Sequence, residues 1–87
     1  MFVIELRNIK ITTDRTYSRY YAGKGKYRNS FSLSSSIRGA MLFGSKEEAE
    51  KRVASDDFQY RLKSENEFLE AIGQEPYNPQ IRKICLQ

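Results

Sequence analysis

The chain has 87 residues, of which 39% are hydrophobic and 30% are charged, and this length and composition predict one ordered domain, residues 1–87, with a modest core. No stretch approaches the ~20 consecutive apolar residues that a membrane-spanning helix needs, and residues 1–30 lack the apolar segment of a signal peptide. We therefore expect a cytoplasmic protein that has no membrane partner. The single cysteine, Cys85, excludes an internal disulfide framework and is expected to be a buried apolar residue of the last strand.

Charge is distributed unevenly between the two halves of the chain. The net charge is +4, but residues 1–46 hold nine lysines and arginines against two acidic residues, a balance of +7. Residues 47–87 hold six basic and nine acidic residues, a balance of −3. A basic first half predicts an anionic partner, either nucleic acid or an acidic protein surface that itself holds nucleic acid.

The first predicted element is a strand over residues 1–7. Phe2, Ile4 and Leu6 alternate with residues of the other face, a period of two that predicts a strand with one face in the core. The alternation then continues in the opposite phase. Because a slip of one residue exchanges the two faces of a strand, we expect a bulge or bend near Arg7–Asn8.

A β-hairpin is predicted next. Residues 16–22 and 27–33 are rich in the aromatic and β-branched residues typical of strands. Between them, Gly23–Lys26 predicts a four-residue loop, because glycine tolerates the backbone angles of tight turns. The serines that follow, Ser34–Ser36, are either a loop or the cap of a short helical turn that reaches Gly39.

The middle of the chain is organised by Ala40–Ala54, where a short apolar run meets a turn at Gly44 and then a helix start at Ser45. Ser45 and Glu48 form the S-x-x-E pattern, in which the hydroxyl accepts from the N–H of Glu48 and the carboxylate accepts from the N–H of Ser45. This pattern predicts a helix of roughly 9 to 11 residues, a length that is marginal alone. We therefore expect the helix to pack on the sheet.

The region after this helix allows two interpretations. Alternation of Phe58, Tyr60 and Leu62 predicts a strand over residues 58–63. Alternatively, Ser55 caps a second helix that runs through the same region.

The remaining elements complete an α+β fold, which we predict to be a small, mainly antiparallel sheet with two short helices packed on one face. A second S-x-x-E pattern, at Ser64 and Glu67, predicts a helix that ends near Gly73, and Ile81–Leu86 is apolar enough for a closing strand. The expected core residues are Phe2, Ile4, Leu6, Phe31, Leu42, Phe43, Ala49, Val53, Phe68, Leu69 and Ile72.

Residues that commonly carry out catalysis are missing. The chain has no histidine and one cysteine, which excludes a structural zinc site and any nucleophile activated by histidine. Gly23–Lys26 lacks the length and the G-K-[ST] ending of a P-loop, so we interpret it as a hairpin loop with exposed lysines. We therefore expect a protein that is not an enzyme and that has no cofactor and no metal.

Basic and aromatic residues are interleaved along the predicted hairpin, from Arg15 to Arg28. Aromatic rings stack on bases while lysine and arginine meet phosphates, but tyrosine and arginine are equally the common anchors of protein interfaces. A third interpretation is that half of the tyrosines face the core and the charges keep the hairpin soluble and its edge protected. The candidate binding residues are Arg15, Tyr17, Arg19, Tyr21, Lys24, Lys26 and Arg28.

The segment Ala40–Lys51, AMLFGSKEEAEK, resembles a pattern in small accessory proteins of phages and mobile elements of Gram-positive bacteria. In those proteins a short hairpin with a tyrosine-rich strand and a Gly/Lys turn precedes an A-x-L-F-x-S-x-E-E-A-E helix start. Tyr20–Gly25 is similar to that turn, so the resemblance covers residues 17–54. Capping chemistry alone favours much of this pattern.

The resemblance implies a small non-catalytic protein that inhibits a host defence factor by protein–protein contact, as many anti-CRISPR proteins do. Its partner would be a host protein or a ribonucleoprotein complex in the cytoplasm of an infected bacterial host. Several inhibitors of this class are strongly acidic DNA mimics, and the basic first half of this chain departs from them. The alternative is a nucleic-acid-binding accessory protein that uses the hairpin of residues 15–28. The sequence leaves the oligomeric state open.

Overall fold

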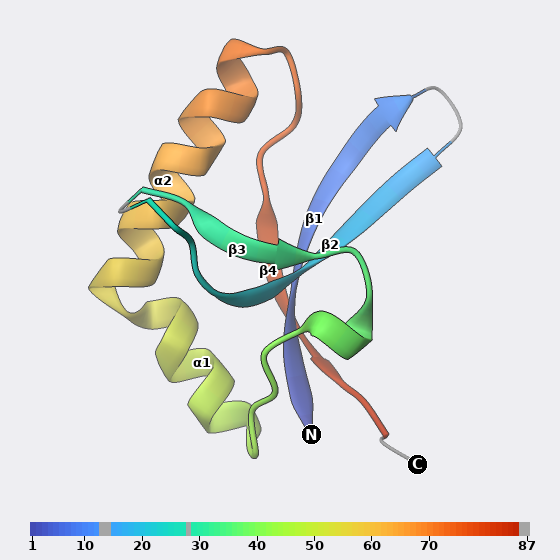
Figure 1. Ribbon diagram of the computed structural model, residues 1–87, viewed down its shortest axis with the longest axis vertical. Coiled ribbons are helices and arrows are strands. Elements are labelled where there is room, and N and C mark those ends of the chain that lie inside the picture. The colour runs from blue at the N-terminus through green and yellow to red at the C-terminus, as the bar shows by residue number, and fades with distance from the viewer. Residues whose placement is uncertain (13–14, 28, 86–87) are drawn as a thin grey trace.

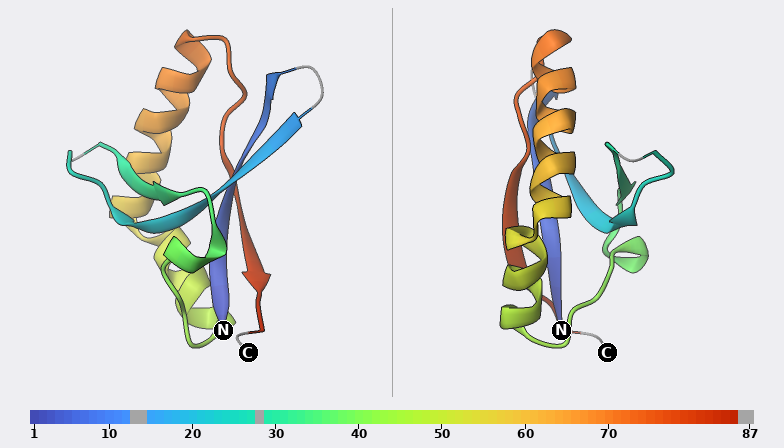
Figure 2. Two further views of the ribbon diagram at one scale, coloured as in Figure 1. Left: turned by 45° about the vertical axis from the view of Figure 1, so that its right-hand side comes forward. Right: turned by 90° about the vertical axis from the view of Figure 1, so that its left-hand side faces the viewer.

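The computed structural model of the protein describes residues 1–12, 15–27 and 29–85, with the backbone alone described in 7–12 and 15–18 (Figure 1). Within this part of the chain, the strands form one antiparallel sheet in the order β3-β2-β1-β4. Figure 2 shows helices α1 and α2 on the same face of the sheet, so the predicted α+β fold is confirmed. The elements are β1 (Phe2–Thr12), β2 (Arg15–Lys24), β3 (Phe31–Ser34), the 3-10 helix η1 (Ile37–Gly39), α1 (Lys46–Ala54), α2 (Asp56–Ala71) and β4 (Asn78–Lys83).

Helix α1 begins where the sequence predicts. The Ser45 hydroxyl accepts a hydrogen bond from the N–H of Glu48 at 3.2 Å. The Glu48 carboxylate accepts from the N–H of Gly44, also at 3.2 Å, one residue before its predicted partner. The helix buries Ala49 and is stabilised mainly by that packing, because nine residues are marginal for an isolated helix.

The predicted strand over residues 58–63 is wrong, because this region is the first half of helix α2. The helix begins after Ser55, whose hydroxyl accepts a hydrogen bond from the N–H of Phe58 at 3.3 Å, as in the second interpretation of the sequence. The alternation is misleading because Tyr60, two residues from buried Phe58, is 54% exposed. The buried side follows helical spacing instead, with Phe58, Arg61 and Leu69.

Helix α2 ends where the sequence predicts, although Ser64 lies inside it and not at its start. Gly73 has a φ of +79°, which favours glycine. The N–H of Gly73 donates to the carbonyl of Glu70 at 3.0 Å, and that of Gln74 donates to the carbonyl of Leu69 at 2.8 Å. This pair of bonds is the Schellman ending, which satisfies carbonyls that the helix leaves without partners.

The hairpin loop is longer than predicted. Strand β2 runs through Lys24 and β3 begins at Phe31, so Tyr27 lies in the loop and not in a strand. The pairing of these strands shifts register between Tyr21 and Gly23. The short helical turn expected as an alternative after the hairpin is present as η1.

The outer strands also differ from their predicted bounds. Strand β1 continues to Thr12, with a pairing irregularity between Asn8 and Thr12, just past the predicted bulge. Strand β4 begins at Asn78, before the predicted start, and its Pro79 is tolerated because β4 pairs with β1 at the edge of the sheet. Cys85 consequently lies beyond the strand and is exposed, so its expected burial is wrong.

The core lies between the sheet and the helices, with three aromatic rings at its centre. The ring centroids of Tyr21 and Phe58 lie 5.2 Å apart, and Phe31 lies 5.6 Å from Tyr21 and 4.8 Å from Phe58. Tyr77 joins the same cluster. The predicted core residues confirmed as buried are Ile4, Leu6, Phe31, Phe43, Ala49 and Leu69, and Phe2 and Val53 pack against them partly buried.

Three predicted core residues are exposed, and the prediction is wrong for Leu42, Phe68 and Ile72. Phe68 is 62% exposed because α2 presents its neighbour Leu69 to the sheet. Leu42 is exposed between two residues, Met41 and Phe43, that pack in or against the core. Among the residues whose side chains the structure describes, the buried ones that the predicted core omits are Val3, Glu5, Tyr21, Ala40, Phe58, Arg61 and Tyr77.

Candidate binding site at the β2–β3 loop

The structure describes the side chains of four of the seven candidate binding residues. The side chains of Arg15 and Tyr17 on β2, and the whole of Arg28, lie outside the described residues. The four described side chains do not share one surface. They are those of Arg19, Tyr21, Lys24 and Lys26.

Tyr21 is part of the core and cannot serve as an exposed anchor. Its side chain is 1% exposed and its ring meets Phe31 edge-on, at an interplanar angle of 86°. Side chains alternate between the faces of a strand, and Tyr21 points to the face that the helices cover. The predicted binding role of Tyr21 is therefore corrected to a packing role.

Arg19 shares that face of β2, since it lies two residues from Tyr21, and it is half-buried. Burial raises the pKa of the Tyr77 hydroxyl, while the positive charge of Arg19 lowers this pKa and nearby Glu65 raises it. Arg19 is thus close enough to the buried Tyr77 to act on it electrostatically. It does not belong with the exposed residues of the loop.

Lys26 and Tyr27 form the exposed tip of the β2–β3 loop. Tyr27 is 66% exposed, and the ammonium of Lys26 lies 5.8 Å from the centroid of its ring, a cation–π distance. The N–H of Gly25 donates to the carbonyl of Ser30 at 3.1 Å and closes the loop. Glycine is required at position 25, because a Cβ there would lie 2.8 Å from the Ser30 carbonyl group.

Arg61 of helix α2 holds this loop in place. The residue is only 7% exposed, and its Nη1 donates to the carbonyl oxygens of Tyr27 at 2.8 Å and Ser30 at 2.7 Å. Its Nε donates to Asp57 Oδ2 at 2.9 Å. The Glu65 carboxylate accepts from the N–H of Phe31 at 3.3 Å, so two successive turns of α2 bind the loop and its following strand.

The Asp57–Arg61 pair keeps its charges. The hydrogen bond from Arg61, together with its positive charge, lowers the pKa of the Asp57 carboxyl below its usual 3.8. The two residues are four apart on a helix, the spacing at which side chains meet. This spacing is the sequence signal for Arg61, and it applies only if the region is helical, which is one of the two interpretations that the sequence leaves open.

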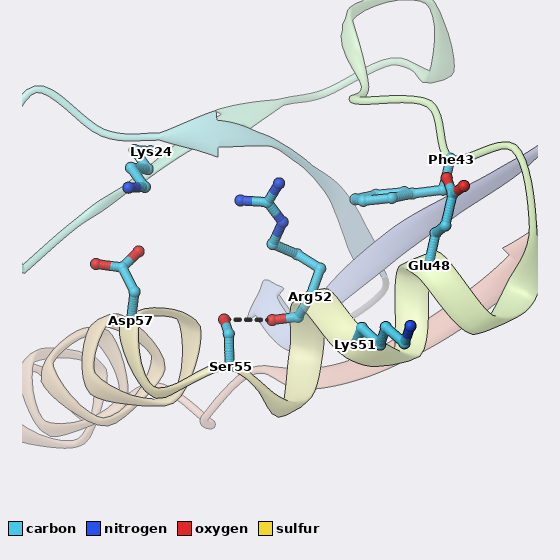
Figure 3. A pocket seen from close by; sticks show the side chains of 7 residues that line it. All are labelled: Lys24, Phe43, Glu48, Lys51, Arg52, Ser55 and Asp57. Atoms are coloured by element: carbon cyan, nitrogen blue, oxygen red, sulfur yellow. Dashed lines mark hydrogen bonds between the residues drawn. The ribbon is translucent and has the colours of Figure 1, made fainter.

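Lys24 is exposed at the end of strand β2. Figure 3 shows its side chain facing a cavity, across from Asp57 at the start of α2. Lys26 and Tyr27, which also lie in the predicted binding segment, are not among the residues that line this cavity. The arrangement offers an exposed aromatic tip, whose backbone is hydrogen-bonded to α2, and a charged cavity.

In the part of the chain that the structure describes, no three acidic or cysteine side chains are grouped so that they could hold a metal ion. Among those same residues, no helix is long and apolar enough to cross a membrane. Compared with known protein families, curated proteins and solved structures, the chain shows no match.

Proposed function

We propose that this protein is a non-catalytic binding protein that acts by protein–protein contact, with the Lys26–Tyr27 tip as its anchor. The observation that carries the proposal is the buried Arg61, which fixes the backbone of an exposed loop through Tyr27 and Ser30. Tyrosine is enriched among the residues that dominate binding energy at protein interfaces. Backbone groups that are already held by hydrogen bonds also lose less conformational entropy on binding.

The class of partner that we propose is a host protein or a ribonucleoprotein complex, which the protein would inhibit by occupying its surface. The support is the resemblance of residues 17–54 to phage accessory proteins, together with the positive charge of the first half of the chain. A cationic tip favours an acidic surface on the partner, because opposite potentials speed association and suppress wrong partners.

The second candidate is nucleic-acid binding through the same tip. Lys26 beside the exposed ring of Tyr27 combines a phosphate contact with a stacking surface. The burial of Tyr21 and the position of Arg19 weaken this candidate, because they remove an aromatic ring and a cation from the expected platform.

Site-specific photo-cross-linking in bacterial cells tests the first candidate. A photoreactive phenylalanine analogue replaces Tyr27 in one variant and Tyr60 in a matched control, since Tyr60 is also exposed but lies on α2. We expect discrete protein adducts at position 27 that survive nuclease treatment and are absent at position 60. Equal adducts at both positions, or none at position 27, would reject the tip as the anchor.

Fluorescence anisotropy with short single- and double-stranded DNA and RNA tests the second candidate. Binding tighter than about 10 μM at roughly 0.15 M salt, with a steep salt dependence, would favour nucleic acid over protein. Tyr27→Ala should then weaken binding while Tyr60→Ala leaves it unchanged.

A further inference from the structure

A cavity of about 460 Å³ lies between the end of β2, helix α1 and the start of helix α2 (Figure 3). Its charged lining comes from all three elements. Strand β2 supplies Lys24 and helix α2 supplies Asp57. Helix α1 supplies Glu48, Lys51 and Arg52. Phe43 forms an apolar wall. The volume lies within the range of small-molecule sites, which is about 300–1,000 Å³.

Two cations of this cavity, Lys24 and Arg52, act on the Asp57 carboxyl only through their charge, which helps to lower its pKa. Arg52 is half-buried, and Figure 3 shows its guanidinium pointing into the space between Lys24 and Asp57. Among the residues that the structure describes, the side chains of Lys24, Lys51 and Arg52 make no hydrogen bond or ion pair. The guanidinium of Arg52 therefore has hydrogen-bond donors that the described protein groups do not use and that face the cavity.

The other polar groups of the cavity are already engaged. Asp57 accepts from Arg61 at 2.9 Å, and Glu48 accepts from the N–H of Gly44 at 3.2 Å. The Ser55 hydroxyl donates to the carbonyl of Arg52 at 2.7 Å and accepts from the N–H of Phe58. Among the described residues, the cavity therefore has three cationic side chains without a hydrogen bond and two carboxylates that already accept one, with Asp57 also lying within electrostatic reach of Lys24 and Arg52.

We propose that this cavity binds a phosphate group, held between the guanidinium of Arg52 and the ammonium of Lys24. Arginine and phosphate form paired, charge-assisted hydrogen bonds, and lysine adds a point charge. Lys51 at the rim would attract the anion, and Phe43 leaves an apolar wall for an organic part of the ligand. The site does not depend on the Lys26–Tyr27 tip, so it goes beyond the proposed protein-binding function.

Titrations followed by two-dimensional ¹H–¹⁵N NMR test this site at constant ionic strength. The probes are inorganic phosphate, pyrophosphate and AMP, which distinguish a free anion from a phosphate on an organic molecule. We expect at least one probe to shift the amide signals of Lys24, Arg52 and Asp57 saturably, with a Kd below about 1 mM. Shifts that stay linear up to about 10 mM for all three probes would overturn the proposal.

Three substitutions separate a site from general attraction. Arg52→Gln should raise the Kd about tenfold, whereas Arg38→Gln, which removes an exposed arginine of η1, should leave it within about twofold. Glu48→Gln should lower the Kd about threefold, because it removes a negative charge from the cavity. Equal weakening by Arg52→Gln and Arg38→Gln would overturn the proposal. If Arg52→Gln alters the fold, Lys24→Gln takes its place with the same expectation.

Discussion

Arg61 donates a 2.7 Å hydrogen bond to the carbonyl oxygen of Ser30, 31 positions earlier in the chain, and so ties helix α2 to the β2–β3 loop. The same Nη1 also donates to the carbonyl oxygen of Tyr27, at 2.8 Å. A planar guanidinium can reach the loop and Asp57 together, because its donors point in fixed, divergent directions. Arg61 thus contributes, together with Glu65, to the position of the exposed Lys26–Tyr27 tip.

Replacement of this arginine should loosen the loop and destabilise the fold. We expect Arg61→Ala to lower the free energy of unfolding by about 2–4 kcal/mol, since it removes two charge-assisted hydrogen bonds to the loop and leaves Asp57 without its ion-pair partner. Urea unfolding followed by circular dichroism measures the change. Arg61→Lys should recover little of it, because an ammonium does not reproduce the guanidinium fork. A loss no larger than that of Lys63→Ala, an exposed control on α2, would contradict the role of Arg61.

The two phenylalanines Phe43 and Phe68 should respond in opposite ways to truncation. Phe43 is buried in the core, so Phe43→Ala should lower the free energy of unfolding by about 3–5 kcal/mol. Phe68 is exposed, so Phe68→Ala should change it by less than about 0.5 kcal/mol. Chemical denaturation of both variants under the same conditions provides the comparison. Similar values for the two would reject this packing of α2.

Acidification should weaken the Asp57–Arg61 pair. Since Arg61 lowers the pKa of Asp57 below 3.8 in the folded protein, the unfolded chain binds this proton more tightly. The stabilising contribution is therefore present above the usual value of 3.8 and is lost as the pH falls through the lowered value. We expect the stability of Asp57→Asn to fall less than that of the wild type between about pH 6 and pH 3.

Denaturation midpoints at several pH values test this expectation. Asp56→Asn serves as the control, because it removes a carboxylate from the same turn without touching the bond to Arg61. If the stability of Asp57→Asn falls with pH as much as that of the wild type, the Asp57–Arg61 pair does not contribute to the stability of the folded protein.

Replacement of Gly73 by alanine should destabilise the protein only through the strain of its positive φ. Its φ of +79° is unfavourable for residues with a Cβ, and an added Cβ would meet no atom within 4 Å. We expect Gly73→Ala to lower the free energy of unfolding by about 1 kcal/mol. Gly44→Ala, whose Cβ would lie 3.7 Å from the nearest Glu48 oxygen, should be close to neutral in thermal unfolding. Equal effects would argue against strain at position 73.

The features that the sequence by itself determined are local ones. The Ser45 cap of α1, the glycine ending of α2 and the core face of β1 follow from interactions within a few residues, and each is confirmed. The same is true of the fold class, because the number and type of elements limit how they can be layered. Lys26 was identified as exposed from its place beside the glycines of a turn.

Only the tertiary structure decided the features that depend on distant segments. Phe58, Tyr60 and Leu62 fit a strand, while the first and last of them also fit the four-residue spacing of a helix. Likewise, the direction of Tyr21 depends on which face of β2 the helices cover. The role of Arg61 depends on a loop about 30 positions away in the chain. The cavity likewise depends on distant segments, because Lys24 and Arg52 line it together. Burial and long-range hydrogen bonds are properties of the packed chain, and spacing along the sequence does not encode them directly.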